Sequence, residues 1–130
     1  MIKSYLNFSH FPFALFLIII LATCSGCRKE GTGGKSSVSG TVFHHSQPIS
    51  NAIVYIKYGA KEFPGTDVSV YDDHTTVDAN AKYEFSKLRK GDYYLYGVGY
   101  DNAIFLPVTG GIPVKLKYNK SENTDVPVTE

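Results

Sequence analysis

The sequence predicts an all-β fold in which two antiparallel sheets pack face to face as a sandwich. Short runs rich in β-branched and aromatic residues alternate between apolar and polar side chains, and Gly, Pro, Asn and Asp separate one run from the next. No window of the chain keeps the apolar spacing of an amphipathic helix. A chain of 130 residues fits one domain. Short strands separated by regular turn signals are typical of a two-sheet sandwich.

We expect seven strands, with limits set by the turn residues between them. They cover 38–43, 52–58, 68–77, 82–85, 92–100, 103–108 and 114–118. The third is expected to be interrupted by a bulge at Asp72 and Asp73. Residues 44–51 predict a turn and residues 59–67 predict a loop, because each stretch contains a proline among polar and small residues.

Alternation along the strands predicts which side chains form the core, since successive residues of a strand point to opposite faces. The side chains expected inside are Ala52, Val54, Ile56, Tyr83, Phe85, Leu88, Tyr93 and Leu95. Gly97 and Gly99 continue this inward face without a side chain, so another segment could approach the backbone closely there.

The opposite face of the same strands is unusually apolar. It carries Ile53, Tyr55, Tyr94 and Tyr96, where a solvated sheet would show Thr, Ser or Lys. An exposed aromatic patch marks many binding surfaces, and tyrosine is suited to stacking on sugars or packing on a protein. These four residues are therefore a candidate binding patch. In the alternative interpretation, the loop near 59–68 covers this face.

The N-terminus has the pattern of an export signal. Lys3 precedes an uncharged apolar run over 11–22, which is shorter than the about 20 residues that a transmembrane helix needs. Both cysteines, Cys24 and Cys27, follow directly, and no cysteine occurs further along. A disulfide framework would distribute cysteines through the folded region, so that class of secreted domain is excluded.

A cysteine that follows a small residue at the end of an apolar run resembles a bacterial lipoprotein signal. The resemblance implies that this cysteine is lipidated and becomes the mature N-terminus. Cys27 is favoured because Gly26 precedes it, and Cys24, which has Leu21 three residues upstream, is the alternative. A plain cleaved signal peptide and an uncleaved anchor are further alternatives.

The chain divides into four parts on this interpretation. They are a lipoprotein signal peptide (1–26), a flexible Gly/Ser tether (27–37), the β-sandwich (38–118) and a polar C-terminal tail (119–130). The tether is expected to be flexible because it has charged, Gly and Ser residues but no apolar side chain to bury after its cysteine. The residues after Cys27 are similar to lipoprotein starts of the Bacteroidota. This likeness implies an anchor in the outer membrane and leaves the periplasmic and the surface-exposed side both open.

Four stretches of the sequence resemble the carboxypeptidase regulatory-like domain. They are 38–42, 48–56, 76–85 and 88–95. The resemblance implies a seven-stranded, transthyretin-like (prealbumin-like) sandwich that is shared with collagen-adhesin B-type repeats, and it is uninformative about function. The family usually has glycine where Ala81 stands. Because a left-handed backbone is unfavourable for alanine, we expect Asn80 to take the positive φ in this turn.

Charge argues against a nucleic-acid partner. The formal net charge is +1, and the densest basic cluster, Lys87, Arg89 and Lys90, falls in an expected turn. A nucleic-acid-binding domain would show a basic stripe or face instead.

Catalytic and metal motifs are missing from the sequence. It contains no nucleophile elbow, phosphate-binding loop or His-Glu-x-x-His helix, so we expect no enzymatic activity and no cofactor. Imidazole and carboxylate suit zinc, so His44 and His45 with His74 or Asp72 are the zinc ligands that the sequence offers. Adjacent strand residues point to opposite faces, so both histidines would need a turn. We therefore predict no metal site.

The sequence as a whole favours a non-enzymatic β-sandwich module of the cell envelope, joined to the membrane through an N-terminal lipid. Its expected role is that of an accessory that binds a protein partner or a glycan. The alternative is a structural, adhesin-like envelope subunit that assembles by strand pairing. A small hydrolase is a weaker rival because no nucleophile and base pair is evident in the sequence.

Overall fold

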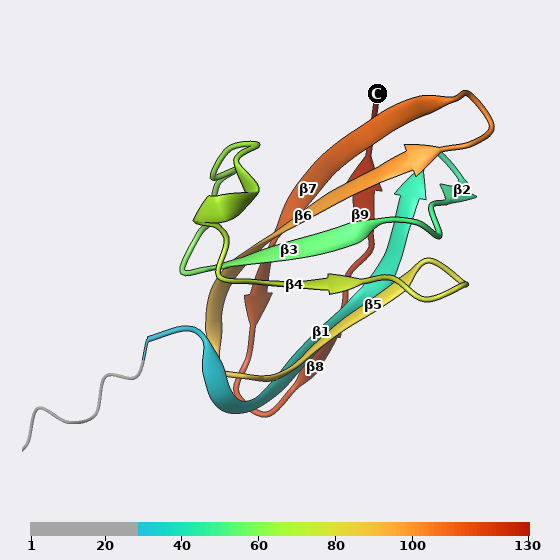
Figure 1. The fold of residues 1–130 in the computed structure, drawn as a ribbon. Helices are drawn as coiled ribbons and strands as arrows, with labels where there is room; N and C mark the ends of the chain where they lie inside the picture. The colour runs from blue at the N-terminus through green and yellow to red at the C-terminus, as the bar shows by residue number, and fades with distance from the viewer. Residues whose placement is uncertain (1–28) are drawn as a thin grey trace, which may run out of the picture.

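Two β-sheets face each other across one apolar core in the computed structural model, which describes residues 29–130 (Figure 1). The first sheet is built around the long strand β1 (Thr32–His44). β5 (Lys82–Leu88) and the short β2 (Gln47–Pro48) pair with it antiparallel. β8 (Ser121–Asn123) and β9 (Val126–Val128) pair with its other edge and run parallel to it.

The second sheet contains four antiparallel strands in the order β4-β3-β6-β7. These strands are β4 (Asp73–Thr76), β3 (Ile53–Tyr58), β6 (Gly91–Asp101) and β7 (Leu106–Leu116). β6 and β7 pair residue by residue along their whole length. The prediction of an all-β protein with two mostly antiparallel sheets is confirmed, whereas the described residues form nine strand segments instead of the seven strands expected.

Two strand predictions were wrong in their limits. Residues Val68–Val70 form a 3₁₀ turn, η2, because the Asp67 carboxylate caps it by accepting hydrogen bonds from the backbone N–H and hydroxyl of Ser69. The expected bulged strand over 68–77 is thus reduced to β4. The two strands expected at 103–108 and 114–118 are one strand, β7, since Gly110 and Gly111 continue the pairing with β6.

The prediction of a flexible tether over 27–37 was wrong for the residues that the structure describes. β1 begins at Thr32, and hydrogen bonds hold residues on both sides of this position. The N–H of Gly31 donates to the hydroxyl of Tyr93 at 2.9 Å, and the carbonyl of Gly31 accepts from the N–H of Arg89 at 2.8 Å. Ser36 is buried, and its hydroxyl donates to the carbonyl of Lys117 at 2.6 Å. Composition does not reveal such backbone partners.

The prediction of a polar tail over 119–130 was also wrong. This segment supplies β8 and β9, and the side chains of Val126 and Val128 are fully buried in the core. The backbone of Thr129 then exchanges two hydrogen bonds with Thr109 of β7, each at 2.8 Å. The C-terminal segment therefore closes one side of the sandwich between its two sheets.

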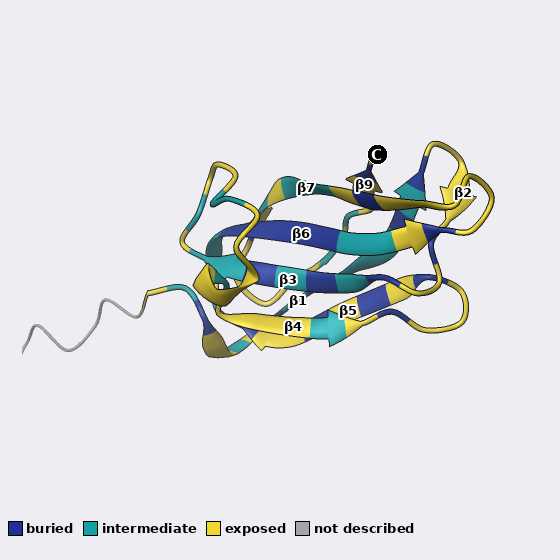
Figure 2. Cartoon of the chain, turned by 45° about the horizontal axis from the view of Figure 1, so that its top comes forward, coloured by how far each residue is buried: buried dark blue, intermediate teal, exposed yellow. Residues whose placement is uncertain are grey.

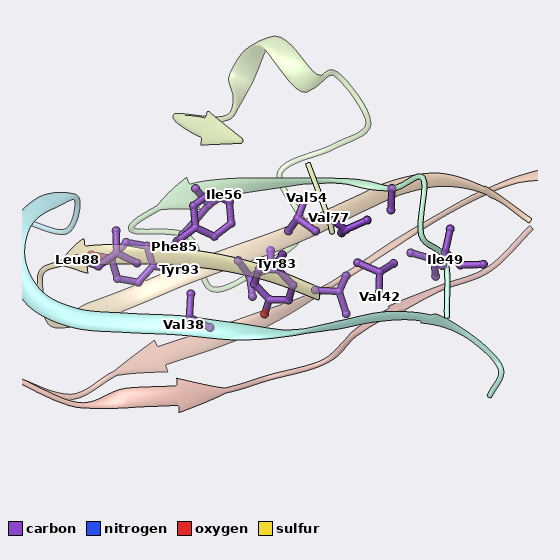
Figure 3. Close-up of a cluster of buried hydrophobic side chains, with 14 of the residues drawn as sticks. Val38, Val42, Ile49, Val54, Ile56, Val77, Tyr83, Phe85, Leu88 and Tyr93 are labelled. Atoms are coloured by element: carbon purple, nitrogen blue, oxygen red, sulfur yellow. The ribbon is translucent and has the colours of Figure 1, made fainter. Parts of the chain in front are cut away.

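The core matches the sequence prediction closely. Every side chain expected inside is buried, and Figure 3 shows the central group, which includes Tyr83 and Phe85 of β5 and Ile56 of β3. β6 is buried through most of its length, whereas the edge strand β4 is mostly exposed (Figure 2). Burying a side chain of this size contributes about 1.5–3 kcal/mol, so this shared core is the main source of stability.

Glycines on the inward face permit close approach, as expected. A Cβ at Gly97 would lie 3.1 Å from side-chain carbons of Val126 and Val128, so β9 packs directly against the β6 backbone there. The turn before β5 corrects another prediction. Ala81, and not Asn80, takes the left-handed conformation, with φ of 60°. The Asp78 carboxylate accepts hydrogen bonds from the backbone N–H groups of Asn80 and Lys82 and so stabilises this turn.

Within residues 29–130, no helix has the length and apolar character needed to cross a bilayer. The predicted signal peptide (1–26) and both candidate lipidation sites, Cys24 and Cys27, lie outside the described residues.

Candidate functional site

The candidate patch of tyrosines lies on one face, as the sequence predicted, but it is not an open surface. In the β3–β6 pairing Tyr55 lies opposite Tyr96, and Ile53 lies opposite Val98 on the same face. Tyr94 and Tyr96 are only 8% and 3% exposed. Of the two interpretations that the sequence left open, the exposed binding patch is therefore wrong for these two tyrosines, while Ile53 and Tyr55 are half-buried.

The loop between β3 and β4 covers this face, as the alternative interpretation proposed. The ring of Phe63 lies 5.8 Å from that of Tyr94 and 5.3 Å from that of Tyr96. Tyr71, which follows η2, stacks on Tyr96 at 5.5 Å with an interplanar angle of 16°. Burial raises the pKa of Tyr71 to about 12. These rings form a second, smaller apolar layer, so Tyr94 and Tyr96 cannot stack on a sugar without movement of the loop.

A cleft of about 360 Å³ lies at the end of the sandwich where the described residues begin. Its lining residues come from the start of β1, the turn after β5 and the segment after β7: Gly33, Gly34, Lys35, Ser36, Arg89, Lys90 and Tyr118. We call it the Tyr118 cleft. It lies within the size range of small-molecule sites, which are typically 300–1,000 Å³ by general survey.

Glycines shape the wall of the Tyr118 cleft. Between Thr32 and Ser36 the register of β1 against β5 shifts, and both residues lie opposite Leu88. Gly33 has φ of 96°, and a Cβ at Gly34 would collide with the backbone of Leu88. The chain can therefore bulge outward here only because these positions lack side chains.

Cations and an aromatic ring line the same cleft. Tyr118 is 69% exposed, and the side chains of Lys35 and Lys90 are exposed as well. Arg89 donates from Nη1 to the carbonyl of Lys29 at 3.2 Å, while its Nε is buried without a hydrogen-bond partner among residues 29–130. Three positive charges next to a flat ring favour a ligand that carries both an anionic group and an apolar face.

The sequence singled out Arg89 and Lys90 only as a solvated basic turn. Tyr118 and the glycines were missed, because the cleft forms from three segments that are distant in sequence. Tyr118 ends the last predicted strand (114–118), and an aromatic residue at this position was the feature of the sequence that could have indicated the cleft.

The opposite end of the sandwich holds a buried histidine between two carboxylates. His44, at the end of β1, is 3% exposed. Its Nδ1 lies 2.7 Å from Oδ2 of Asp101, and its Nε2 lies 2.6 Å from Oε2 of Glu130. The hydrogen bond to Asp101 is the main cause that raises the pKa of His44, and the same bond lowers the pKa of Asp101.

His74 is not part of this group. Its ring lies 5.6 Å from that of Tyr55, on the covered face of the other sheet. Asp72, the other zinc ligand that the sequence offered, accepts a hydrogen bond from the backbone N–H of Tyr58 at 2.7 Å. The grouping considered from the sequence is therefore wrong in those members, and Asp101 and Glu130 were missed because no local motif joins them to His44.

Comparison with known proteins gives a fold likeness and no family. No protein-family model matches the sequence, and no curated protein is significantly similar to it in sequence. Among solved structures, the fold resembles that of a Pseudomonas aeruginosa protein described as a "putative carbohydrate binding protein". The two share 14% identity with a TM-score of 0.52, over 75% of this chain and 90% of the other. Identity this low supports the shared sandwich fold alone.

Proposed function

We propose that this protein is a non-enzymatic module of the cell envelope that binds an anionic glycan in the Tyr118 cleft. The observation that carries the proposal is the exposed ring of Tyr118 beside the cations Lys35, Arg89 and Lys90. The apolar face of a sugar ring stacks on an exposed tyrosine, and the carboxylate or sulfate of an acidic sugar pairs with lysine or arginine.

The similarity of the fold to another protein also supports glycan binding. The Pseudomonas aeruginosa protein, whose description names carbohydrate binding, has a sandwich that aligns with three quarters of this chain. Of the two partners expected from the sequence, a glycan is thus favoured over a protein. The resemblance to carboxypeptidase regulatory-like domains is kept as a proposal for the family, since that family also contains accessory modules.

The proposed anchor would put the cleft near a membrane. We propose lipidation of Cys27, with Cys24 as the alternative, in the outer membrane. Gly33 is six residues after Cys27 in the sequence, and an extended chain spans at most about 3.6 Å per residue. A cleft within about 20 Å of the lipid would meet envelope glycans close to the membrane surface.

The structural, adhesin-like role has less support. Assembly by donation of a strand needs a segment that is not already paired within its own chain. β8 and β9, at the C-terminal end of the described residues, are already paired with β1 of the same chain. We therefore keep glycan binding as the single proposed function.

Binding of the full chain, purified in detergent, to polygalacturonate and to neutral dextran tests the proposal. We expect retention on the acidic polymer, a loss of about tenfold or more in affinity for Tyr118→Ser and for Lys90→Gln, and no retention on dextran. Tyr100→Ser is the matched control, because Tyr100 is an exposed tyrosine of β6. Equal affinity of Tyr118→Ser and the wild type would exclude the cleft as the site. Retention on anionic vesicles without retention on the polymer would replace the glycan by a lipid.

A further inference from the structure

A second group of side chains, at the end of the sandwich opposite the Tyr118 cleft, has the composition of a metal site. We call it the His44 cluster, and it consists of His44, His45 and Glu130. Their ligand atoms, one from each residue, all lie within 4.8 Å of one another. The two imidazole rings are 4.4 Å apart between centroids.

The backbone brings two consecutive imidazoles together in an unusual way. Neighbouring residues of a strand point to opposite faces, which would separate His44 from His45. However, β1 ends at His44, and His45 begins the turn to β2 with φ of 53°. A non-glycine residue with positive φ is uncommon. Here it turns the second imidazole back toward the first.

Asp101 holds His44 in the orientation that a metal ligand needs. The Asp101 carboxylate is buried, and its Oδ1 accepts from the N–H of Ala103 at 2.8 Å, so its position is fixed. Its Oδ2 binds Nδ1 of His44, which leaves Nε2 directed at Glu130. Histidines that bind metals almost always donate their other ring N–H to such a carboxylate or to a carbonyl.

We propose that Nε2 of His44, an imidazole nitrogen of His45 and a carboxylate oxygen of Glu130 together bind one divalent transition-metal ion, with Zn²⁺ as the preferred ion. Two imidazoles and one carboxylate are a ligand set that Zn²⁺ takes, with a fourth position for water. Ca²⁺ and Mg²⁺ prefer oxygen ligands throughout and are excluded by the two nitrogens.

Ion binding would replace a proton. Without metal, Nε2 of His44 lies 2.6 Å from Oε2 of Glu130, so that a proton on Nε2 makes a hydrogen bond to this carboxylate. On binding, Nε2 loses that proton to solvent and donates its lone pair to the ion, while Nδ1 keeps its proton and donates a hydrogen bond to Oδ2 of Asp101. The carboxylates of Asp101 and Glu130 then balance the charge of the ion, so the site is neutral with two neutral imidazoles.

Zn²⁺ binding to the full chain tests this proposal independently of glycan binding. The protein carries Cys24→Ser and Cys27→Ser, so that no thiol competes for the ion, and has neither a histidine tag nor any residue added after Glu130. Affinity is measured by competition with a chromogenic chelator, and stability by thermal unfolding with Zn²⁺ or with EDTA. We expect one ion per chain and a higher Tm with Zn²⁺ than with EDTA.

The variants separate the proposed ligands from other zinc-binding groups. We expect His45→Asn and Glu130→Gln to weaken Zn²⁺ binding by about tenfold or more, and Asp101→Asn to weaken it by about tenfold through the orientation of His44. Asparagine tolerates the positive φ at position 45, so His45→Asn should fold. His74→Asn is the control, because His74 is an exposed histidine outside the cluster, and it should bind like the parent. Equal affinity of the parent and His45→Asn, or the absence of any Zn²⁺ binding by a folded parent, would overturn the proposal.

Discussion

The imidazole of His44 lies 2.7 Å from the carboxylate of Asp101, although 57 residues separate them in the sequence. The pair joins the ends of β1 and β6, which belong to different sheets. Because both side chains are buried, each charge depends on the other. The contact therefore ties the two sheets together at this end and makes their association sensitive to pH.

The pH dependence has a definite direction. The pKa of His44 is raised above its ordinary value of 6.5 in the folded protein. This shift stabilises the fold fully at pH values below 6.5, and the stabilisation is lost as the pH rises through the folded pKa. The pKa of Asp101 is lowered below its ordinary value of 3.8. This shift stabilises the fold at pH values above 3.8, and the stabilisation is lost as the pH falls through the folded pKa. In urea with EDTA, we expect the wild type to be more stable at about pH 5.5 than at about pH 8. Asp101→Asn should reduce this difference, and an unchanged difference would contradict the assignment.

The C-terminal strands should be essential to the core. Val126→Ala removes about two methylene equivalents from a fully buried site, so we expect a loss of about 2 kcal/mol in the free energy of unfolding. Thr129→Ala is the control, because Thr129 is exposed and its bonds to Thr109 use only the backbone. Chemical denaturation measures both. A cost below about 0.5 kcal/mol for Val126→Ala would mean that this segment is a tail after all.

The covered aromatic face gives another stability prediction. Tyr96→Ser removes a ring that packs between Phe63 and Tyr71, so we expect it to cost about 3 kcal/mol. Tyr100→Ser, on the same strand but exposed, should cost less than about 1 kcal/mol. Urea unfolding of the two variants is the measurement. Similar small costs for both would show that the loop does not cover the face in solution.

Gly40 of β1 tests the contact between this strand and the C-terminal segment. A Cβ there would collide with the backbone carbonyl of Thr124. We expect Gly40→Ala to destabilise the protein by about 1–3 kcal/mol, as overpacking of a closed contact does. Ser39→Ala, at the neighbouring half-buried position, should lie within about 0.5 kcal/mol of the wild type. Thermal unfolding distinguishes them, and equal Tm values would argue against the close approach.

Local patterns predicted the core well and the sites poorly. The period of two assigned Val54 and Tyr93 to the interior because burial of one sheet face imposes that period. The same signal is present in Val126 and Val128, on either side of Pro127, but polar neighbours and the proline hid it. Proline is tolerated here because β9 pairs with β1 along one of its edges and the side chain of Pro127 is exposed.

The sites depend on contacts that no local pattern encodes. The Tyr118 cleft joins the start of β1 to residues near positions 89 and 118, and the His44 cluster joins residues 86 positions apart. The cover of the tyrosine face is a similar case, because the sequence predicts a loop over 59–67 and leaves cover of this face as one of two interpretations. Tyr94 and Tyr96 were therefore correctly placed on the face opposite the core, while the sequence left open whether this face is a binding patch or is covered.

Residue-level mapping of glycan binding shows whether the Tyr118 cleft is the binding site. The amide signals of ¹⁵N-labelled protein are followed by NMR while an oligogalacturonate is added, with EDTA present so that the His44 cluster stays free of metal. If the Tyr118 cleft binds the glycan, we expect saturable shifts at Gly33, Gly34 and Tyr118, and no such shifts in Tyr118→Ser. Shifts confined to other parts of the molecule, or none at millimolar oligogalacturonate, would contradict it.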